Sequence, residues 1–359
     1  MTQFRGLMAM SIAALLCGGA VAQQVPLPNV DDEGTITGQQ VVVPLSNFLS
    51  EEIKAEFASR LRETSPISLA DGLDAVRARS DEGAKGQLDR WLEIYPSSIQ
   101  DTEINGVHVH IVVPDSGIAD GNDNRVLINA HQGGFMFGGA YGGQLESVPL
   151  AGLAGVKAIA VDYRLAPEHT FPAASEDMEA VYRHVLETTP PANVGIYGCS
   201  AGGTLTAQVI PWFREKGLPL PGAIGIFCSG AMNTFWFGGD AGVLSPLLNA
   251  SRPVNRGNME NQPRNYFEGV DQDDPLVTPG EFPEALAAYP PTLVVSGTRD
   301  IAMSNAVMTH TRLLEAGVEA DLFIQEGLGH GHFFMFPGTP EAETAHRVIW
   351  NFFDRHLGR

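Results

Sequence analysis

The fold of this chain is decided by the stretch VGIYGCSAGG, which spans residues 194–203. Its first four residues predict a buried strand, and the residues after the serine predict a helix that stops at Pro211. Between them lies a Gly-x-Ser-x-Gly pattern. A strand-to-helix turn of this kind holds its serine strained and exposed above a sheet. Gly198 and Gly202 suit the turn because a side chain at either position would obstruct it. We therefore predict that Ser200 is a nucleophile.

Apolar runs and helical stretches alternate on both sides of this turn. The expected strands are 107–113, 126–130, 158–161, 194–197, 223–227, 293–295 and 322–324. Further helices are expected from Pro172 onward, around 307–314 and around 345–353. Most of these strands are apolar throughout, which predicts the α/β class with a mostly parallel central sheet and helices on both faces.

A serine hydroxyl is a weak nucleophile that needs a base, and the base needs an acid to orient it. With the serine on a central strand, the acid is expected after a later strand and the histidine after the next one. Asp300 follows the run 292–296, and His330 follows the run 322–324. Asp321 is a weaker candidate for the acid because it lies at the opposite end of its strand.

Two histidines compete for the role of the base. The sequence GLGHGH, residues 327–332, places His330 and His332 two positions apart. If this loop is extended, both side chains point the same way, so direction alone does not separate them. Gly331 would let the loop bring His330 over Ser200 without a clash. We expect His330 to be the base and keep His332 as the alternative.

The negative charge that develops during attack on a carbonyl needs hydrogen-bond donors, which are usually backbone N–H groups. The sequence HQGG, residues 131–134, follows an expected strand and provides a loop with two glycines. Gly133 and Gly134 would let the backbone approach a substrate oxygen closely, and Ala201 would give a third N–H group. Without a serine downstream, a plain glycine-rich turn would be the better interpretation.

Several motifs in order resemble the hormone-sensitive-lipase-like branch of the α/β-hydrolases, a group of bacterial carboxylesterases. HQGG is similar to its HGGG motif, GCSAGG to GDSAGG, and residues 327–331 to GMxHG. DYRLAPEH at 162–169 and FPAA at 171–174 match a further block of the family. The similarity covers about residues 105–355.

The resemblance implies an α/β-hydrolase fold with a helical cap and a cofactor-free acyl transfer that prefers short-chain esters. It also implies that Arg164, Glu168 and His169 are structural supports of the oxyanion region. The chain departs from the pattern at Gln132, which replaces a glycine that the family does not use as a donor. It departs again at Cys199, which replaces an aspartate and should point away from the site.

A third departure is His332, which stands where the family usually has phenylalanine.

Rival interpretations are a lactone or amide hydrolase with the same three residues, or a non-catalytic binding protein on the same fold. The intact Ser200, Asp300 and His330 argue against the latter. The cap segments carry no readable specificity motif, so the sequence names neither the natural ester nor the oligomeric state.

The first 22 residues have the features of a secretory signal peptide. Arg5 precedes an apolar stretch, and the small-x-small pattern at 20–22 predicts cleavage after Ala22. A periplasmic or secreted protein is therefore expected. Lipidation at Cys17 is the alternative, although Leu16 is bulkier than is usual in such signals. The apolar stretch is too short for a stable membrane span.

The chain of 359 residues carries 42 acidic and 22 basic side chains, a formal net charge of −20. Such an excess disfavours nucleic acid and anionic membrane surfaces as partners. The resemblance implies a small-molecule ester as the partner. No cofactor is expected.

The pairs His108-x-His110 and His330-x-His332 suggest metal ligands, but no cysteine or carboxylate cluster with ligand spacing accompanies either, so no metal is expected. Cys199 and Cys228 form no disulfide framework and are interpreted as small buried side chains.

The expected organisation is a signal peptide (1–22), an N-terminal extension with cap helices (23–100) and a catalytic domain (101–359). The extension contains apolar residues at four-residue spacing, which predict a helix: Leu49, Ile53, Phe57 and Leu61. The interval 231–285 is long and rich in Asn, Gly and Pro, so it is expected to form a cap insertion over the site. The aromatic runs 135–137 and 235–237 fit a substrate pocket or ordinary core packing equally well.

Overall fold

The computed structural model describes residues 29–30, 36–37, 42–63, 72–232, 239–249 and 266–358. The chain forms two compact units, Met1–Pro44 and Leu45–Arg359. In the first unit, β1 (Asn29–Val30) pairs with β2 (Ile36–Thr37) in antiparallel fashion. The expected leader with its cleavage site lies outside the described residues, as does the aromatic run 235–237.

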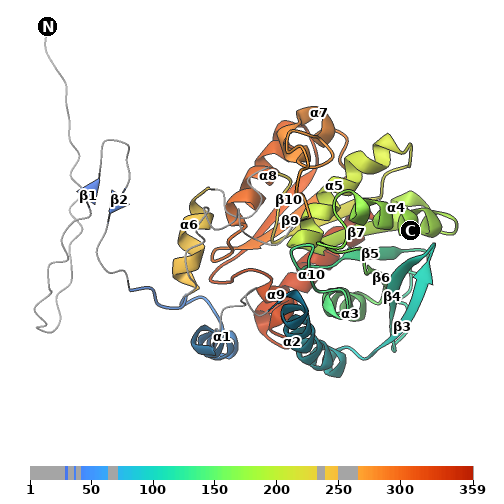
Figure 1. Ribbon diagram of the computed structural model, residues 1–359. Helices are drawn as coiled ribbons and strands as arrows, with labels where there is room; N and C mark the ends of the chain where they lie inside the picture. The colour runs from blue at the N-terminus through green and yellow to red at the C-terminus, as the bar shows by residue number, and fades with distance from the viewer. Residues whose placement is uncertain are drawn as a thin grey trace, which may run out of the picture. The chain divides into compact units, whose positions relative to one another are not determined.

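The second unit is built on an eight-stranded sheet with the order β10-β9-β8-β7-β5-β6-β4-β3 (Figure 1). All neighbours pair in parallel except at one edge, where β4 is antiparallel to both β6 and β3. The strands are β3 (Ser97–Ile104), β4 (Val107–Pro114), β5 (Val126–Ala130), β6 (Lys157–Val161), β7 (Val194–Cys199), β8 (Ala223–Phe227), β9 (Thr292–Gly297) and β10 (Ala320–Gln325). The predicted mostly parallel sheet is confirmed.

Helices cover both faces of this sheet. They are α1 (Glu51–Glu63), α2 (Leu73–Ile94), α3 (Gly142–Ala154), α4 (Ala173–Leu186), α5 (Ala201–Glu215), α6 (Gly239–Leu248), α7 (Pro283–Leu286), α8 (Met303–Glu315), α9 (His332–Met335) and α10 (Pro340–His356). Two single-turn 3₁₀ helices, Pro191–Asn193 and Pro279–Glu281, complete the set. Successive residues of a strand point to opposite faces, so Ile128 packs in a core with α4, α5 and α8. Its neighbour Leu127 packs in a second core with α2, α3 and α10.

The N-terminal helices belong to the same compact unit as the sheet. Trp91 of α2 is buried in the second core, and its ring N–H donates to the carbonyl oxygen of Phe334 at 2.7 Å. The apolar face predicted for α1 is buried against Leu328 and Phe336, next to the histidine loop. The edge strand β3 begins at Ser97, before the expected boundary at residue 101. Its alternation of polar and apolar residues suits an edge strand with one face in solvent.

The expectation that Pro211 stops a helix is wrong, because α5 continues through it to Glu215. A proline inside a helix leaves the carbonyl four residues earlier without its usual N–H partner. Here that carbonyl belongs to Ala207, and it accepts a hydrogen bond from the Tyr289 hydroxyl at 2.7 Å. A side chain distant in sequence therefore replaces the missing bond, and the helix goes on.

The expected insertion 231–285 contains α6, the 3₁₀ helix 279–281 and the start of α7 within its described part. The Ser245 hydroxyl of α6 donates to the carbonyl oxygen of Arg299 at 2.7 Å. This contact fixes α6 beside the residue that precedes Asp300. Among the described residues, none of the helices is both long and apolar enough to span a bilayer.

Candidate active site

Ser200 lies at the turn between β7 and α5, with a φ of 61°. A positive φ is strained for a residue with a side chain, as expected for a sharp strand-to-helix turn. A Cβ added at Gly198 would lie 2.2 Å from the Ala130 carbonyl oxygen, and one at Gly202 would lie 1.8 Å from the same atom. Both glycines are therefore required because β5 passes directly against the turn.

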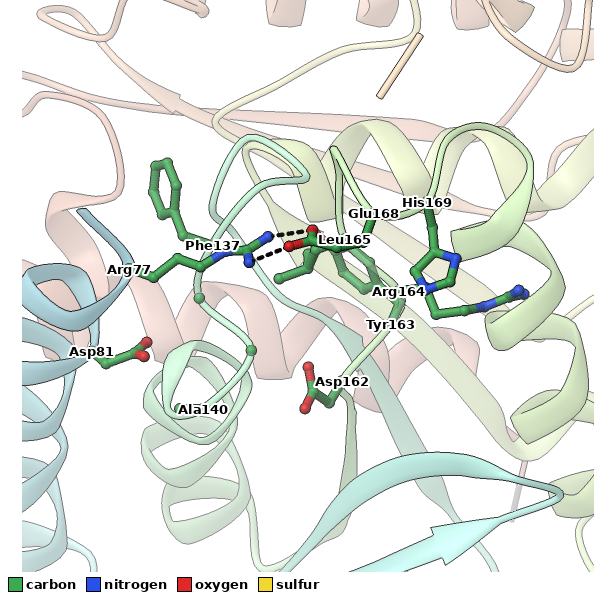
Figure 2. A pocket seen from close by; sticks show the side chains of 12 residues that line it. Arg77, Asp81, Phe137, Ala140, Asp162, Tyr163, Arg164, Leu165, Glu168 and His169 are labelled. Atoms are coloured by element: carbon green, nitrogen blue, oxygen red, sulfur yellow. Dashed lines mark hydrogen bonds and ion pairs between the residues drawn. The ribbon is translucent and has the colours of Figure 1, made fainter. Parts of the chain in front are cut away.

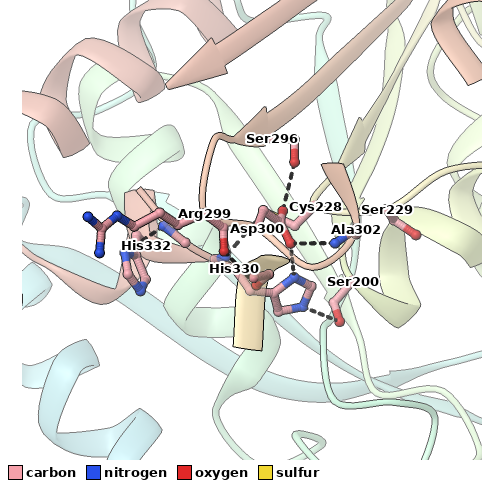
Figure 3. Close-up of polar contacts among 12 residues, drawn as sticks. Ser200, Cys228, Ser229, Ser296, Arg299, Asp300, Ala302, His330 and His332 are labelled. Atoms are coloured by element: carbon pink, nitrogen blue, oxygen red, sulfur yellow. Dashed lines mark hydrogen bonds and ion pairs between the residues drawn. The ribbon is translucent and has the colours of Figure 1, made fainter. Parts of the chain in front are cut away.

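The structure brings Ser200, His330 and Asp300 together in one chain of hydrogen bonds (Figure 3). The Ser200 hydroxyl oxygen is 2.9 Å from Nε2 of His330, and Nδ1 of His330 is 2.7 Å from Oδ1 of Asp300. Ser200, Asp300 and His330 follow β7, β9 and β10, and they meet at the carboxyl ends of these parallel strands. In this arrangement the imidazole can take the serine proton while the carboxylate holds the ring.

Asp300 is completely buried, and its second oxygen also has a partner. The Ser296 hydroxyl donates to Oδ2 at 2.8 Å, and the backbone N–H of Ala302 donates to Oδ1 at 2.9 Å. Burial opposes ionisation of this carboxyl. The charge of His330 and the three hydrogen bonds outweigh burial and lower the pKa of Asp300 below its ordinary value. The acid is therefore held as a carboxylate.

His332 is turned away from Ser200, and its ring packs edge-on against Phe57 and Phe336. Its Nδ1 accepts a hydrogen bond from the backbone N–H of Gly329 at 2.9 Å. Burial lowers the pKa of His332 to about 3, so the ring is neutral. Gly331 has a φ of 67°, so the loop is not extended as assumed above, and the two histidines diverge. His332 braces the loop that carries His330.

The sequence predicts three backbone N–H donors, those of Gly133, Gly134 and Ala201. Gly133 has a φ of 126°, and a Cβ there would lie 1.8 Å from the Phe137 carbonyl oxygen, so only glycine fits. Gly134 has a φ of 62° and open space around its Cα. Within the described residues, neither glycine donates its N–H to another backbone group. Ala201 is the first residue of α5, where an N–H has no partner inside the helix.

A buried glutamate beneath this loop was not found by sequence reasoning. Oε1 of Glu146 accepts from the backbone N–H of Gln132 at 2.9 Å. Oε2 accepts from the Asn129 amide at 3.0 Å and from the backbone N–H of Cys199 at 3.2 Å. Glu146 thus joins the residue before the two glycines to the residue before the nucleophile. Its only signal in the sequence is one acid within the apolar segment 145–151.

Burial raises the pKa of Glu146 to about 8, although its three hydrogen bonds oppose the shift. The carboxyl is therefore mostly protonated at neutral pH. Cys199 and Cys228 are also buried, and both are free thiols. Sγ of Cys228 accepts a hydrogen bond from the backbone N–H of Gly331 at 3.2 Å. Burial raises the pKa of the Cys199 thiol well above its usual range, so this residue is no competing nucleophile.

Arg77 of α2 ties the block 162–169 to the loop that follows Gly133 and Gly134 (Figure 2). The Arg77 guanidinium makes a two-pronged ion pair with Glu168, at 2.7 Å for each prong. It also donates to the carbonyl oxygens of Met136 and Ala166 at 2.8 and 2.9 Å. Sequence reasoning assigned Glu168 a supporting role but missed Arg77, because the helix that carries it lies outside the family motifs.

Arg164 is a second supporting residue. Its Nε is 2.9 Å from a carboxylate oxygen of Asp177, and its Nη2 is 2.7 Å from one of Glu176. His169 lines the pocket of Figure 2 and is exposed. In the run 135–137, Phe135 is a core residue, 1% exposed and stacked on Tyr266 with 4.5 Å between ring centroids.

A family model described as alpha/beta hydrolase fold matches residues 127–334. An acetyl-hydrolase of Streptomyces hygroscopicus is 28% identical over 240 residues, which cover 64% of this chain and 75% of that protein. The esterase LipI of Mycobacterium tuberculosis is 28% identical over 289 residues, 78% of this chain and 87% of its own length.

Solved structures agree with these relatives. Esterase E25 superposes with a TM-score of 0.75 at 27% identity, covering 89% of this chain and 98% of that one. An esterase from the bacterial hormone-sensitive lipase family superposes with a TM-score of 0.72 at 26% identity, covering 86% of this chain and 99% of that one. The likeness therefore includes both the sheet and the helices that precede it.

Proposed function

The chain belongs to the alpha/beta hydrolase fold family, in its hormone-sensitive-lipase-like branch, and it is a carboxylic-ester hydrolase; from this premise we propose a serine esterase that acts on short-chain esters. The observation that carries the proposal is the unbroken chain of hydrogen bonds from Ser200 through His330 to Asp300, at 2.9 and 2.7 Å. No second function class is needed to account for this geometry.

In the proposed reaction, Ser200 attacks the ester carbonyl and His330 accepts its proton. Asp300 holds the ring and stabilises the cation that forms on it. The N–H groups of Gly133, Gly134 and Ala201 donate to the oxygen that becomes negative. The alcohol leaves with the proton from His330, and an acyl-serine remains. Water then repeats the attack with His330 as base, and the carboxylic acid is released.

The preference for short acyl groups rests on relatives. One of them is named an acetyl-hydrolase. The resemblance of the motifs to the hormone-sensitive-lipase-like branch also implies short-chain substrates. The expected partner is a small-molecule ester.

The test is a set of p-nitrophenyl esters with acyl chains from acetate to palmitate. We expect the highest kcat/KM for acetate or butyrate. Ser200→Ala should lower kcat by about 10³–10⁶-fold. Cys199→Ala should keep most of the activity, because its thiol is buried away from the substrate. Full activity in Ser200→Ala would refute the serine mechanism, whereas a maximum at palmitate would refute only the short-chain preference.

We also propose that residues 1–22 form a leader that is cleaved after Ala22, so that the mature protein is periplasmic or secreted. The support is the small-x-small pattern behind an apolar stretch. Protein purified from its natural host should begin at Gln23 in N-terminal sequencing. An intact mass that shows an acylated Cys17 would replace this proposal with a lipid anchor.

A further inference from the structure

A cluster of two histidines and one carboxylate lies at the antiparallel edge of the sheet, on different strands from Ser200. His108 and His110 are two residues apart on β4, so the pleat places both side chains on one face. Asp101 of β3 is the cross-strand partner of His110. Side chains at paired positions share a face, so Asp101 lies on the same side as both histidines.

The ligand atoms of this cluster are close enough for one ion. Oδ1 of Asp101 is hydrogen-bonded to Nε2 of His108 at 2.7 Å, a contact that a bound ion would replace, and Oδ2 is 3.8 Å from Nε2 of His110. One ligand atom from each of the three residues lies within 4.8 Å of the other two. Tetrahedral zinc with bonds of about 2.0–2.1 Å separates its ligand atoms by about 3.3–3.4 Å. The two distances from Asp101 to the histidine nitrogens lie on either side of that spacing. Asp101 is exposed, so its carboxylate can adjust by a small rotation.

A further carboxylate orients one of the histidines. Asp162, at the end of β6, has Oδ2 at 3.0 Å from Nδ1 of His108. This contact leaves Nε2 of His108 facing Asp101. Histidines that bind metals commonly donate their other ring N–H to a carboxylate, which fixes the ring and increases its basicity. His108 therefore has the partner that a metal-ligating histidine requires.

The second histidine is buried and lacks a hydrogen bond. His110 is 6% exposed, and no hydrogen bond from the described residues reaches either of its ring nitrogens. Its Nε2 points toward Asp101 at a distance too long for a hydrogen bond. A metal ion at Nε2 would give this buried imidazole a partner.

We propose that Asp101, His108 and His110 bind a divalent transition-metal ion of the zinc class, with water as the fourth ligand. Two imidazoles and one carboxylate are ligands that zinc accepts, and the fourth position faces solvent beside the exposed Asp101. Asp81 of α2 and Asp162 line the neighbouring pocket together, so the surroundings add negative charge (Figure 2). The two arginines of that pocket are already paired with Glu168 and Asp177.

The ion would link the sheet edge to the oxyanion region. Asp162 opens the block 162–169, and a Cβ at Gly139 would lie 2.4 Å from its Oδ1. The carboxylate that orients His108 therefore also packs against the loop that follows Gly133 and Gly134. An ion bound at β3 and β4 would fix this carboxylate in place and stabilise the folded state by binding to it alone.

The test uses the full chain, stripped with a chelator, and titrates it with Zn²⁺ alone by calorimetry. We expect one Zn²⁺ per chain and a higher Tm in its presence. Asp101→Asn and His110→Gln should each weaken binding at least about tenfold and abolish the Tm shift. Asp162→Asn should weaken it by about 10–100-fold. Cobalt in place of zinc should give the visible absorption of a four-coordinate ion, and Asp101→Asn should remove it.

Two matched controls separate this site from other histidines. His184 is exposed and lies 3.4 Å from Glu187, a histidine–carboxylate pair without a second histidine. His330→Gln removes the only other metal-binding geometry among the described residues, which consists of Cys228, Asp300 and His330. His184→Gln and His330→Gln should both bind Zn²⁺ as the unaltered chain does. Loss of binding in His330→Gln alone, or binding that Asp101→Asn and His110→Gln leave unchanged, would overturn the proposal. So would the absence of saturable binding to the unaltered chain.

Discussion

The chain contains two His-x-His pairs, and the backbone that carries each pair decides what it can do. On β4, the regular alternation of a strand keeps His108 and His110 on one face, 4.8 Å apart between ring centroids. In the loop after β10, the left-handed conformation of Gly331 separates the pair. His330 reaches Ser200, whereas His332 is partly buried and packs against the rings of Phe57 and Phe336. Equal spacing in sequence therefore gives a shared site on a strand and two separate roles in a loop.

The largest expected effect is on kcat, and it distinguishes His330 from His332. His330→Ala should lower kcat by at least about 10³-fold, because the nucleophile loses its base. His332→Phe should cost less than about tenfold, since a ring of similar size can still pack against Phe57 and Phe336. Steady-state kinetics on p-nitrophenyl butyrate measures both. Comparable losses would mean a shared role, and a larger loss at His332 would contradict the divergence of the pair.

A second variant changes Gly331, the residue at which His330 and His332 diverge. Gly331→Ala places a Cβ 2.8 Å from the Phe334 ring at a φ of 67°, so the ring or the loop must shift. We expect kcat to fall by about 10–100-fold, because a displacement of His330 by a fraction of an ångström weakens its alignment with Ser200. The left-handed conformation should also cost about 1–2 kcal/mol in the free energy of unfolding.

The matched control for this variant is Gly317→Ala, which has a φ of 77° and open space around it in the turn between α8 and β10. It should show a similar loss of stability but unchanged kcat. If both alanine variants lose activity equally, kcat follows global stability and not the position of His330.

The smallest expected effect is a change in the free energy of unfolding with pH. It follows from a comparison of two buried acids, one with a histidine partner and one without. The pKa of Asp300, beside His330, is lowered, whereas that of Glu146, which has no histidine partner, is raised from 4.5 to about 8. Folded Glu146 keeps its proton over this range and the unfolded chain does not. The free energy of unfolding should therefore fall as the pH rises from about 4.5 to about 8.

Glu146→Gln should flatten this slope. It should also cost about 1–3 kcal/mol, because its NH₂ group would face the N–H of Gln132 or Cys199. Urea unfolding at a series of pH values gives both quantities. Glu343→Gln, on the exposed side of α10, should leave the slope unchanged. A slope that persists in Glu146→Gln would show that this carboxyl does not hold a proton between pH 4.5 and 8.

Many features around Ser200 could be predicted because the patterns that indicate them lie within short stretches of sequence. The glycines around Ser200, the apolar strands and the positions of Asp300 and His330 after their strands all follow from short stretches of sequence. The strands β5 and β8 have the predicted ends. The edge strand β3 was missed because its residues are mostly polar, and α3 was missed because its apolar residues follow no helical period.

The sequence by itself determined the fold class and the placement of Ser200, Asp300 and His330 after their strands, because each depends on neighbours a few residues away. Only the tertiary structure decided which contacts join distant segments. The Tyr289 hydroxyl lets α5 pass through Pro211, and Glu146 bonds backbone groups of two different loops. The register of β3 on β4 places Asp101 opposite His110. Such pairings depend on how strands and helices pack, and no spacing along the chain specifies them.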